Sequence, residues 1–241
     1  MNEVIKELME RKSVRVYTDQ PIGEAQKEAI LLAAANAPSA GNMQLYSIID
    51  VQDKQVVERL AVLCDNQPFI AQGQMVLVFV SDYLKWHDAF ALAGADPRPL
   101  AKSDLLLSIE DAMAAAMNAV TAADSLGIGS CFIGDIMEHH DEVKELLTLP
   151  DCVYPVCLLV FGYPSDQQKA RTKPERIDLK HLVHNDHYQR KDGETLKEML
   201  IKKCPADQYE NWLRAFCKRK YNSDFSIEMS ASAAKYLEEF K

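Results

Sequence analysis

The sequence has no pair of cysteines spaced as CxxC, no long hydrophobic run and no excess of basic residues. Its six cysteines are scattered through apolar segments, so we expect buried free thiols rather than a zinc site or a disulfide framework. The apolar run MVLVFV is far too short to span a bilayer. The opening MNEVIKELMERK lacks the apolar stretch of a signal peptide, so the sequence predicts a cytoplasmic protein with no membrane partner.

Acidic residues outnumber basic ones by 36 to 27, which gives a formal net charge of -9. Nucleic acids and anionic membranes both attract proteins rich in Lys and Arg, so this balance argues against either partner. What the sequence does have is 48% hydrophobic residues over 241 positions, with only 9 glycines and 10 prolines. This composition predicts a globular protein with a well-packed core.

Hydrophobic periodicity predicts helices and strands in a mixed order, which favours one α+β domain. Helical spacing predicts helices over residues 2–10, from about 24 to before Pro38, and over 54–64, 108–127, 141–147, 194–203, 208–216 and 226–240. Apolar runs bounded by turn residues predict strands over residues 46–51, 75–81, 129–135 and 153–164. Residues 82–104 show no clear period, so we expect a mobile excursion over the surface.

The segment RKSVRVY carries a concentration of cations that is unusual for an acidic chain. If it is extended, Arg11, Ser13 and Arg15 project to one side, and Val14 and Val16 to the other. Two guanidinium groups and a hydroxyl on one edge suit a phosphate, because guanidinium pairs with phosphate in a bidentate manner. A solvated basic turn is the alternative interpretation.

Three further segments stand out, and the first two each allow two interpretations. APSAGNMQ has small residues that let backbone N–H groups approach a flat ligand, or it is only a loop between a helix and a strand. SLGIGSCFIGD places Gly134 where the backbone comes near a ligand, or in a tight turn. ARTKPERID adds a second group of cations, Arg171, Lys173 and Arg176, just after a strand.

In this order and spacing, the four segments resemble the motifs of the FMN-dependent nitroreductase family, in particular its flavin oxidoreductase branch with a long helical C-terminal tail. The resemblance covers about residues 3–190 and, less clearly, the rest. It rests on ERKSVRVYTDQPI, APSAGNMQ, AADSLGIGSCFIGD and KPERIDLKHLVHNDHY. The inserted Glu175 departs from the family's usual Lys-Pro-Arg, which leaves open whether Arg176, Arg171 or both meet the phosphate.

The resemblance implies an α+β fold with a central mixed, mostly antiparallel sheet flanked by helices, in an intertwined homodimer. It implies an FMN-binding domain over residues 1–190, and a helical C-terminal extension over residues 191–241 that packs on the dimer as part of the same domain. It also implies that FMN lies at the dimer interface. Gln44, Gln67 and residues 82–104 would then border the pocket for a small-molecule electron acceptor.

The resemblance implies no catalytic side chain and no metal, because FMN carries the chemistry. Arg11, Ser13 and Arg15 would hold the ribityl phosphate and the pyrimidine edge, and the backbone at Gly134 would lie against the ring. The residues implied to bind FMN are Arg11, Lys12, Ser13, Arg15, Pro38, Ser39, Ala40, Asn42, Gln67, Ile133, Gly134, Asp135, Arg171, Lys173 and Arg176.

The implied activity is that of an FMN-dependent NAD(P)H oxidoreductase, which reduces nitroaromatics, quinones or similar acceptors by ping-pong hydride transfer through flavin N5. Two alternatives stay open: a specialised flavoenzyme, such as a flavin reductase, a dehalogenase or a flavin-degrading enzyme, and a non-catalytic FMN-binding redox sensor. The basic run from Lys218 to Lys220 favours NADPH over NADH, or is a solvated helix end. His139 and His140 are expected in an exposed turn, and residues 181–187 in a strand and turn.

Overall fold

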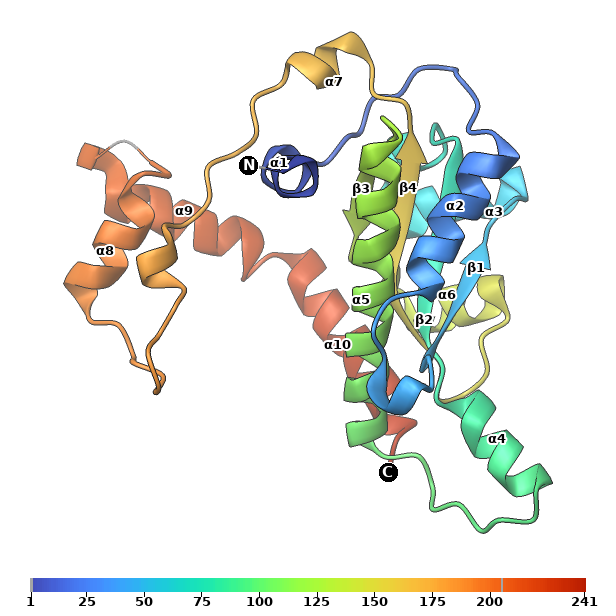
Figure 1. The fold of residues 1–241 in the computed structure, drawn as a ribbon. Helices are drawn as coiled ribbons and strands as arrows, with labels where there is room; N and C mark the ends of the chain where they lie inside the picture. The colour runs from blue at the N-terminus through green and yellow to red at the C-terminus, as the bar shows by residue number, and fades with distance from the viewer. Residues whose placement is uncertain (1, 205) are drawn as a thin grey trace. The chain divides into compact units, whose positions relative to one another are not determined.

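The computed structural model describes residues 2–204 and 206–241. Its core is an antiparallel sheet with the strand order β1-β2-β4-β3 (Figure 1). The strands are β1 (Tyr46–Asp50), β2 (Met75–Ser81), β3 (Gly129–Ile133) and β4 (Tyr154–Gly162). Every residue of the two inner strands, β2 and β4, is buried. The four predicted strands and the α+β class are therefore confirmed.

Helices cover both faces of the sheet (Figure 1). The helices are α1 (Glu3–Glu10), α2 (Glu24–Ala35), α3 (Lys54–Leu63), α4 (Leu84–Leu92), α5 (Lys102–Ser125), α6 (His140–Leu147), α7 (Asp166–Ala170), α8 (Gly193–Ile201), α9 (Tyr209–Lys220) and α10 (Asp224–Glu238). Short 3-10 turns are η1 (Ala40–Asn42), η2 (Pro68–Ile70), η3 (Asp135–Met137), η4 (Leu179–His181) and η5 (Ala206–Gln208). All the predicted helices are present, and α5 begins six residues before its predicted start.

The two faces of the sheet have separate apolar cores. Leu77 and Phe79 of β2 pack with α2 and α5, whereas Val78, between them, packs with α3 and α6. This is the alternation expected of a strand covered on both sides. Ala112 and Ala116 on α5 are fully buried, and their small side chains let this helix lie close to the sheet. By length and composition α5 could also span a membrane, and its burial against the sheet explains that apolar character.

Residues 82–104 contain more regular structure than predicted. Residues 84–92 form α4, which buries none of its side chains, so no apolar period marks it in the sequence. The start of α5 is fixed by Asp104, whose carboxylate accepts the Ala101 N–H at 2.9 Å. Arg98 donates to the same carboxylate through both terminal guanidinium nitrogens, Nη1 and Nη2, at 2.6 and 2.7 Å. These hydrogen bonds lower the pKa of Asp104.

The chain divides into two compact units. One runs up to Arg171 and resumes at Glu228, and the other is Thr172–Ile227. In the second unit, residues 181–187 form turns without a strand, so that prediction is wrong; no strand of the sheet pairs with them. The predicted division after residue 190 stays a prediction.

The last residues of the chain are joined to α6 within the first unit. The Glu239 carboxylate accepts the Cys152 N–H at 2.8 Å and pairs with Lys144 and with His140 Nε2, the latter at 2.9 Å. The other ring nitrogen of His140 lies 2.7 Å from Asp141 Oδ1. His140 is the first residue of α6 and is mostly buried, so the predicted exposed turn is wrong at this position. Its burial depends on a partner 99 residues away, Glu239, which the local sequence does not indicate.

The cysteines are free thiols. Cys64, Cys131 and Cys157 are buried, as predicted, and Cys152 and Cys204 are half-buried. Cys217 contradicts the prediction because it is exposed: it lies on α9, whose only buried residue is Tyr209.

Two glycines let the segment after α1 lie directly against the edge of the sheet. Ser13 bridges Ser130 of β3 in parallel, and the Val14 N–H donates to the Ser130 carbonyl at 2.9 Å. A Cβ added at Gly129 would lie 2.6 Å from Val14 Cγ2, and one added at Gly162 would lie 2.7 Å from Tyr17 Cδ1. The absence of these two side chains therefore makes room for Val14 and Tyr17.

We expect Gly129→Ala to destabilise the fold by about 1–3 kcal/mol, the usual cost of forcing an extra methyl group into a packed region. Gly193→Ala is the control, because a Cβ there meets no atom within 4 Å. Urea unfolding of the two variants measures the difference. Equal midpoints would contradict this account of the sheet edge.

Candidate functional site

Arg11, Ser13 and Arg15 surround one buried side chain at the edge of the sheet, the thiol of Cys131 on β3. Burial raises the pKa of this thiol, and the nearby Arg15, Ser13 and Arg11 side chains partly oppose that shift. The Arg11 Nη1 atom is buried and has no hydrogen-bond partner in the described part of the chain. We call Arg11, Ser13 and Arg15 the cradle; it contains a buried donor that an anion could satisfy.

The predicted alternation along RKSVRVY is confirmed only in part. Val14 is buried, as expected, but Val16 is 41% exposed. The segment pairs with β3 only around Ser13, and further on the Val16 carbonyl accepts the Ser165 N–H at 3.1 Å. The Arg15 N–H donates at 3.1 Å to Oε1 of Gln168, a buried side chain. The segment therefore contacts β3 at its start and, farther along, contacts α7 and the residues just before α7.

Gln67 and Asp135 lie close together on the same side of the sheet as the cradle. Gln67 Nε2 donates to Asp135 Oδ2 at 2.9 Å and to the Cys64 carbonyl at 2.8 Å. Arg15 links this pair to the cradle, because its guanidinium carbon lies 5.8 Å from the centre of the Phe69 ring, two residues beyond Gln67. Three segments that the resemblance assigns to FMN therefore lie along β3 and its end.

The other predicted cations have different surroundings. Lys12 Nζ donates to the carbonyls of Lys169, at 2.7 Å, and Arg171, so its ammonium group ties the cradle segment to α7. Arg171 is exposed at the end of α7. Lys173, which is half-buried, and Arg176, which is exposed, belong to the second unit. Which of these cations meets a phosphate stays a prediction.

The segment with Pro38, Ser39, Ala40 and Asn42 adjoins β1, the edge strand on the far side of the sheet from β3 and the cradle. It precedes β1, and Ile133 and Gly134 end β3; the antiparallel register puts the start of β1 and the end of β3 at the same end of the sheet. β2 and β4 separate the two edge strands, a lateral distance of roughly 14 Å.

Sequence reasoning missed Asp111, the buried acid that holds this segment. Its two carboxylate oxygens accept the backbone N–H groups of Ala40, at 2.9 Å, and Leu45, at 3.1 Å. A signal for it exists in the sequence, since Asp111 is a charged residue beside Ala112, Ala115 and Ala119 in the apolar stripe of α5. A charge at such a position needs partners from another element.

Two of the segments predicted to border the acceptor pocket contact each other. Trp86 Nε1 of α4 donates at 2.6 Å to the carbonyl of Met43, the neighbour of Gln44. Farther along, Tyr83, Phe90 and Arg98 are among the residues that line a hollow of about 190 Å³.

Glu138, just after η3, is a second buried acid. Only 6% of it is exposed, and its Oε2 atom has no hydrogen-bond partner among the described residues. Burial raises the pKa of Glu138 to about 7, and the carboxylates of Asp65, Asp135 and Glu228 add to this effect, while His139 opposes it. The carboxyl group next to the Gln67–Asp135 pair is therefore largely neutral below that pH.

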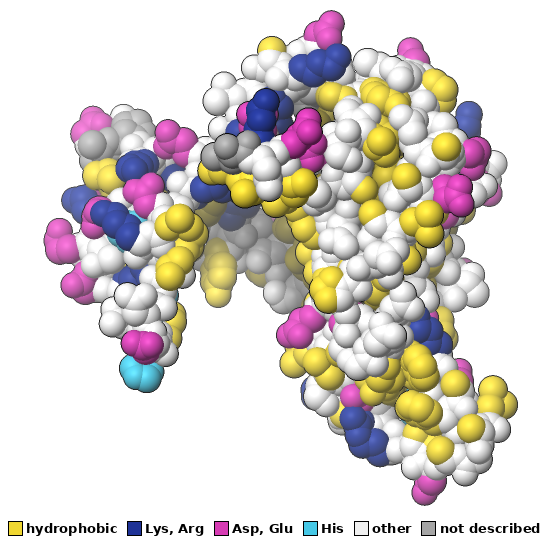
Figure 2. Space-filling view, viewed as in Figure 1, with side chains coloured by type: hydrophobic (Ala, Val, Ile, Leu, Met, Phe, Trp, Pro, Cys, Tyr) yellow, Lys and Arg dark blue, Asp and Glu magenta, His cyan; other side chains and the backbone are white. Residues whose placement is uncertain are grey.

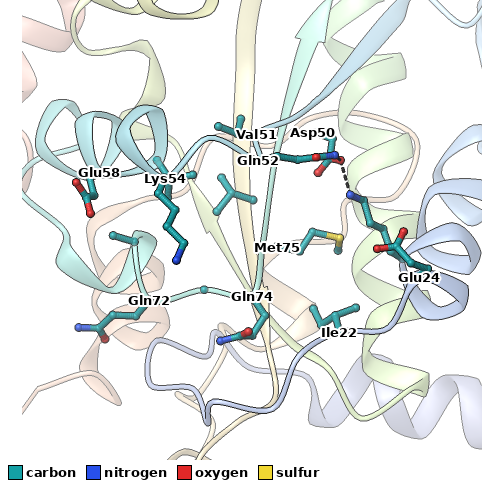
Figure 3. A pocket seen from close by; sticks show the side chains of 15 residues that line it. Ile22, Glu24, Asp50, Val51, Gln52, Lys54, Glu58, Gln72, Gln74 and Met75 are labelled. Carbon is teal, nitrogen blue, oxygen red and sulfur yellow. Dashed lines mark hydrogen bonds and ion pairs between the residues drawn. The ribbon is translucent and has the colours of Figure 1, made fainter.

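A larger hollow, of about 600 Å³, lies elsewhere on the first unit, between the ends of β1 and β2 (Figure 3). Lys54, Gln72 and Gln74 line it, and the ion pair of Lys27 with Asp50 closes one side (Figure 3). None of the residues predicted to bind FMN lines this hollow.

Comparison with known proteins identifies the family. The model of the Nitroreductase family matches residues 8–163, and the chain belongs to this family. It is 32% identical over 223 residues to the FMN reductase (NAD(P)H) of Bacillus subtilis, covering 88% of both chains. It is 35% identical over 196 residues to the oxygen-insensitive NADPH nitroreductase of Salmonella typhimurium, covering 81% of this chain and 79% of that one. The structure of B. megaterium NfrA2 matches with a TM-score of 0.86 at 29% identity and covers 100% of both chains.

We expect Glu138→Gln to stabilise the protein more at pH 8 than at pH 5. The folded state holds the Glu138 proton up to about pH 7, whereas the unfolded chain loses it near its ordinary value, so wild-type stability falls as the pH rises between the two. One unit of pKa corresponds to about 1.4 kcal/mol, so a difference of about 1 kcal/mol or more is expected. Urea unfolding at both pH values measures it, with the exposed Glu142→Gln as control. A gain that is the same at both pH values would contradict the expectation.

Proposed function

We propose that this chain is an FMN-dependent NAD(P)H oxidoreductase that reduces nitroaromatic, quinone or similar small-molecule acceptors. Its family and the names of its relatives support this assignment. The observation that carries it is the cradle, where Arg11 Nη1 is buried without a partner in the described chain, although the net charge is -9. A buried unpaired donor costs free energy, and the phosphate of FMN is an anion that would satisfy it.

FMN, when bound, supplies the electron transfer between the nicotinamide coenzyme and the acceptor. The residues of the chain bind and orient it: Arg11, Ser13 and Arg15 hold the phosphate, and the Gln67 amide, already fixed by Asp135, contacts the ring. At Gly134 an added Cβ would meet no atom within 4 Å, so a flat ring has room to lie against this backbone. The preference for NADPH and the cytoplasmic location stay predictions.

The active form in this proposal is a homodimer, and the placement of the predicted residues supports it. Ser39 and Asn42 lie at one edge of the sheet, while the cradle and Gly134 lie along the other. A second copy of the chain could bring its own Ser39 segment to the flavin without crossing β2 and β4. We therefore assign Pro38, Ser39, Ala40 and Asn42 to the flavin held by the partner.

Exposed apolar side chains support the same assembly. Helix α1 buries no residue, and Val4, Ile5, Leu8 and Met9 are all 45% exposed or more. Figure 2 shows hydrophobic side chains gathered over α1 and over α4. Exposed apolar groups of this extent are typical of surfaces that another chain covers.

The purified protein should be yellow, and anaerobic addition of NADPH or NADH should bleach it rapidly. The comparison of the two coenzymes tests the predicted preference, and a nitrofuran or a quinone should restore the colour. Flavin that binds but is reduced slowly would favour the redox sensor instead. A colourless protein that takes up no added FMN would overturn the proposed function.

We expect Arg15→Ala to weaken FMN binding about tenfold or more, because a hydrogen bond to a charged group contributes roughly 1.5–3 kcal/mol. Arg59→Ala is the matched control, since Arg59 is an exposed arginine on α3 outside the predicted site. Quenching of flavin fluorescence on titration gives both dissociation constants. If the Arg15→Ala protein binds FMN as tightly as wild type does, Arg15 does not contribute to FMN binding.

A further inference from the structure

The segment from Ser39 to Leu45 has a backbone that needs external support. Gly41, Asn42 and Gln44 have φ values of 58°, 57° and 50°, in the left-handed region that favours glycine. Two of these three residues are not glycine, so the segment pays a conformational cost for its shape. A loop of this kind keeps one conformation only where surrounding contacts hold it.

Most of the contacts that hold this segment are local or come from neutral groups. Ser39 Oγ accepts the Gln44 N–H at 2.9 Å, and Gln44 Nε2 donates to the Ala35 carbonyl at 2.9 Å. Trp86 Nε1 donates to the Met43 carbonyl. These bonds shape the turn. Three of the residues that form them, Ser39, Met43 and Gln44, lie in the turn itself.

The support from the core is the carboxylate of Asp111, which is 5% exposed. It accepts N–H groups from both ends of the strained stretch, at Ala40 before it and at Leu45 after it. Bonds from N–H groups to a carboxylate are stronger than bonds between neutral groups, and stronger still away from water. One side chain on the rigid helix α5 thus fixes the ends of the segment relative to the sheet.

We propose that Asp111 is a positioning residue for flavin binding, because it holds residues 39–45 in the conformation that presents Ser39 and Asn42 to FMN. This inference rests on the proposed function. Asp111 touches only the loop backbone in this role. Without its carboxylate, the segment would spend part of its time in other conformations, and the apparent affinity for FMN would fall by the fraction of time in which it is competent.

Asp111→Asn tests this role, because asparagine has the same shape but lacks the charge and turns one acceptor into a donor. Asn118→Ala is the matched control: Asn118 is on the same helix and donates at 3.1 Å to the Ala33 carbonyl on α2, not to the segment. Two quantities are measured on the full chain. One is hydrogen exchange of peptides covering residues 38–46 without flavin, and the other is the dissociation constant of FMN.

Asp111→Asn should raise exchange in residues 38–46 and weaken FMN binding about tenfold, as expected if the segment is competent for about a tenth of the time. Asn118→Ala should do neither. If Asp111→Asn fails to fold, Asp111→Ser, a smaller uncharged side chain, takes its place.

Three results would overturn the inference: unchanged exchange in the segment, raised exchange with wild-type affinity, or equal weakening in both variants. Failure of the wild-type chain to bind FMN would overturn the proposed function, and it is distinguishable because the exchange measurement needs no flavin.

Discussion

The proposed site depends on the close approach of residues 13–17 to the edge of the sheet. Gly129 and Gly162 leave the space that Val14 and Tyr17 fill, and the bond between Val14 and Ser130 fixes the register. Once Ser13 bridges β3, the Arg11 and Arg15 side chains meet the Cys131 thiol from the same segment. The cations are thus gathered by backbone geometry, which overcomes the tendency of like charges to spread over the surface.

The order of the strands has a consequence for the oligomeric state. β1 and β3 are the outer strands of the sheet, and the two buried strands β2 and β4 lie between them. The predicted flavin contacts at Ser39 and at Gly134 therefore adjoin different edge strands, which are roughly 14 Å apart. In the proposed homodimer, the β3 edge of one copy would lie beside the β1 side of the other, so that each flavin would take contacts from both chains.

The sequence predicts the elements that bury continuous apolar surface. β2, β4 and α5 are recognisable because their residues are hydrophobic on every face or at helical spacing. Helix α4 is not recognisable in the sequence, since it buries none of its side chains. The role of His140 is not recognisable either, since its partner Glu239 lies far away in the sequence. Motifs likewise identify the segments of the site.

Only the structure shows which segments of the proposed site meet. The pairing of Gln67 with Asp135 joins residues 68 positions apart. Asp111 needed the structure for the same reason: an acid in an apolar stripe indicates that some partner exists, but not which loop provides it.

Two of the buried acids of the first unit, Asp111 and Glu138, have opposite surroundings. Asp111 has two N–H donors from the loop, one on each carboxylate oxygen. Glu138 has an oxygen without a donor in the described chain and three carboxylates nearby, so it keeps its proton up to about pH 7. The end of β3 is thereby spared a further negative charge beside Asp135.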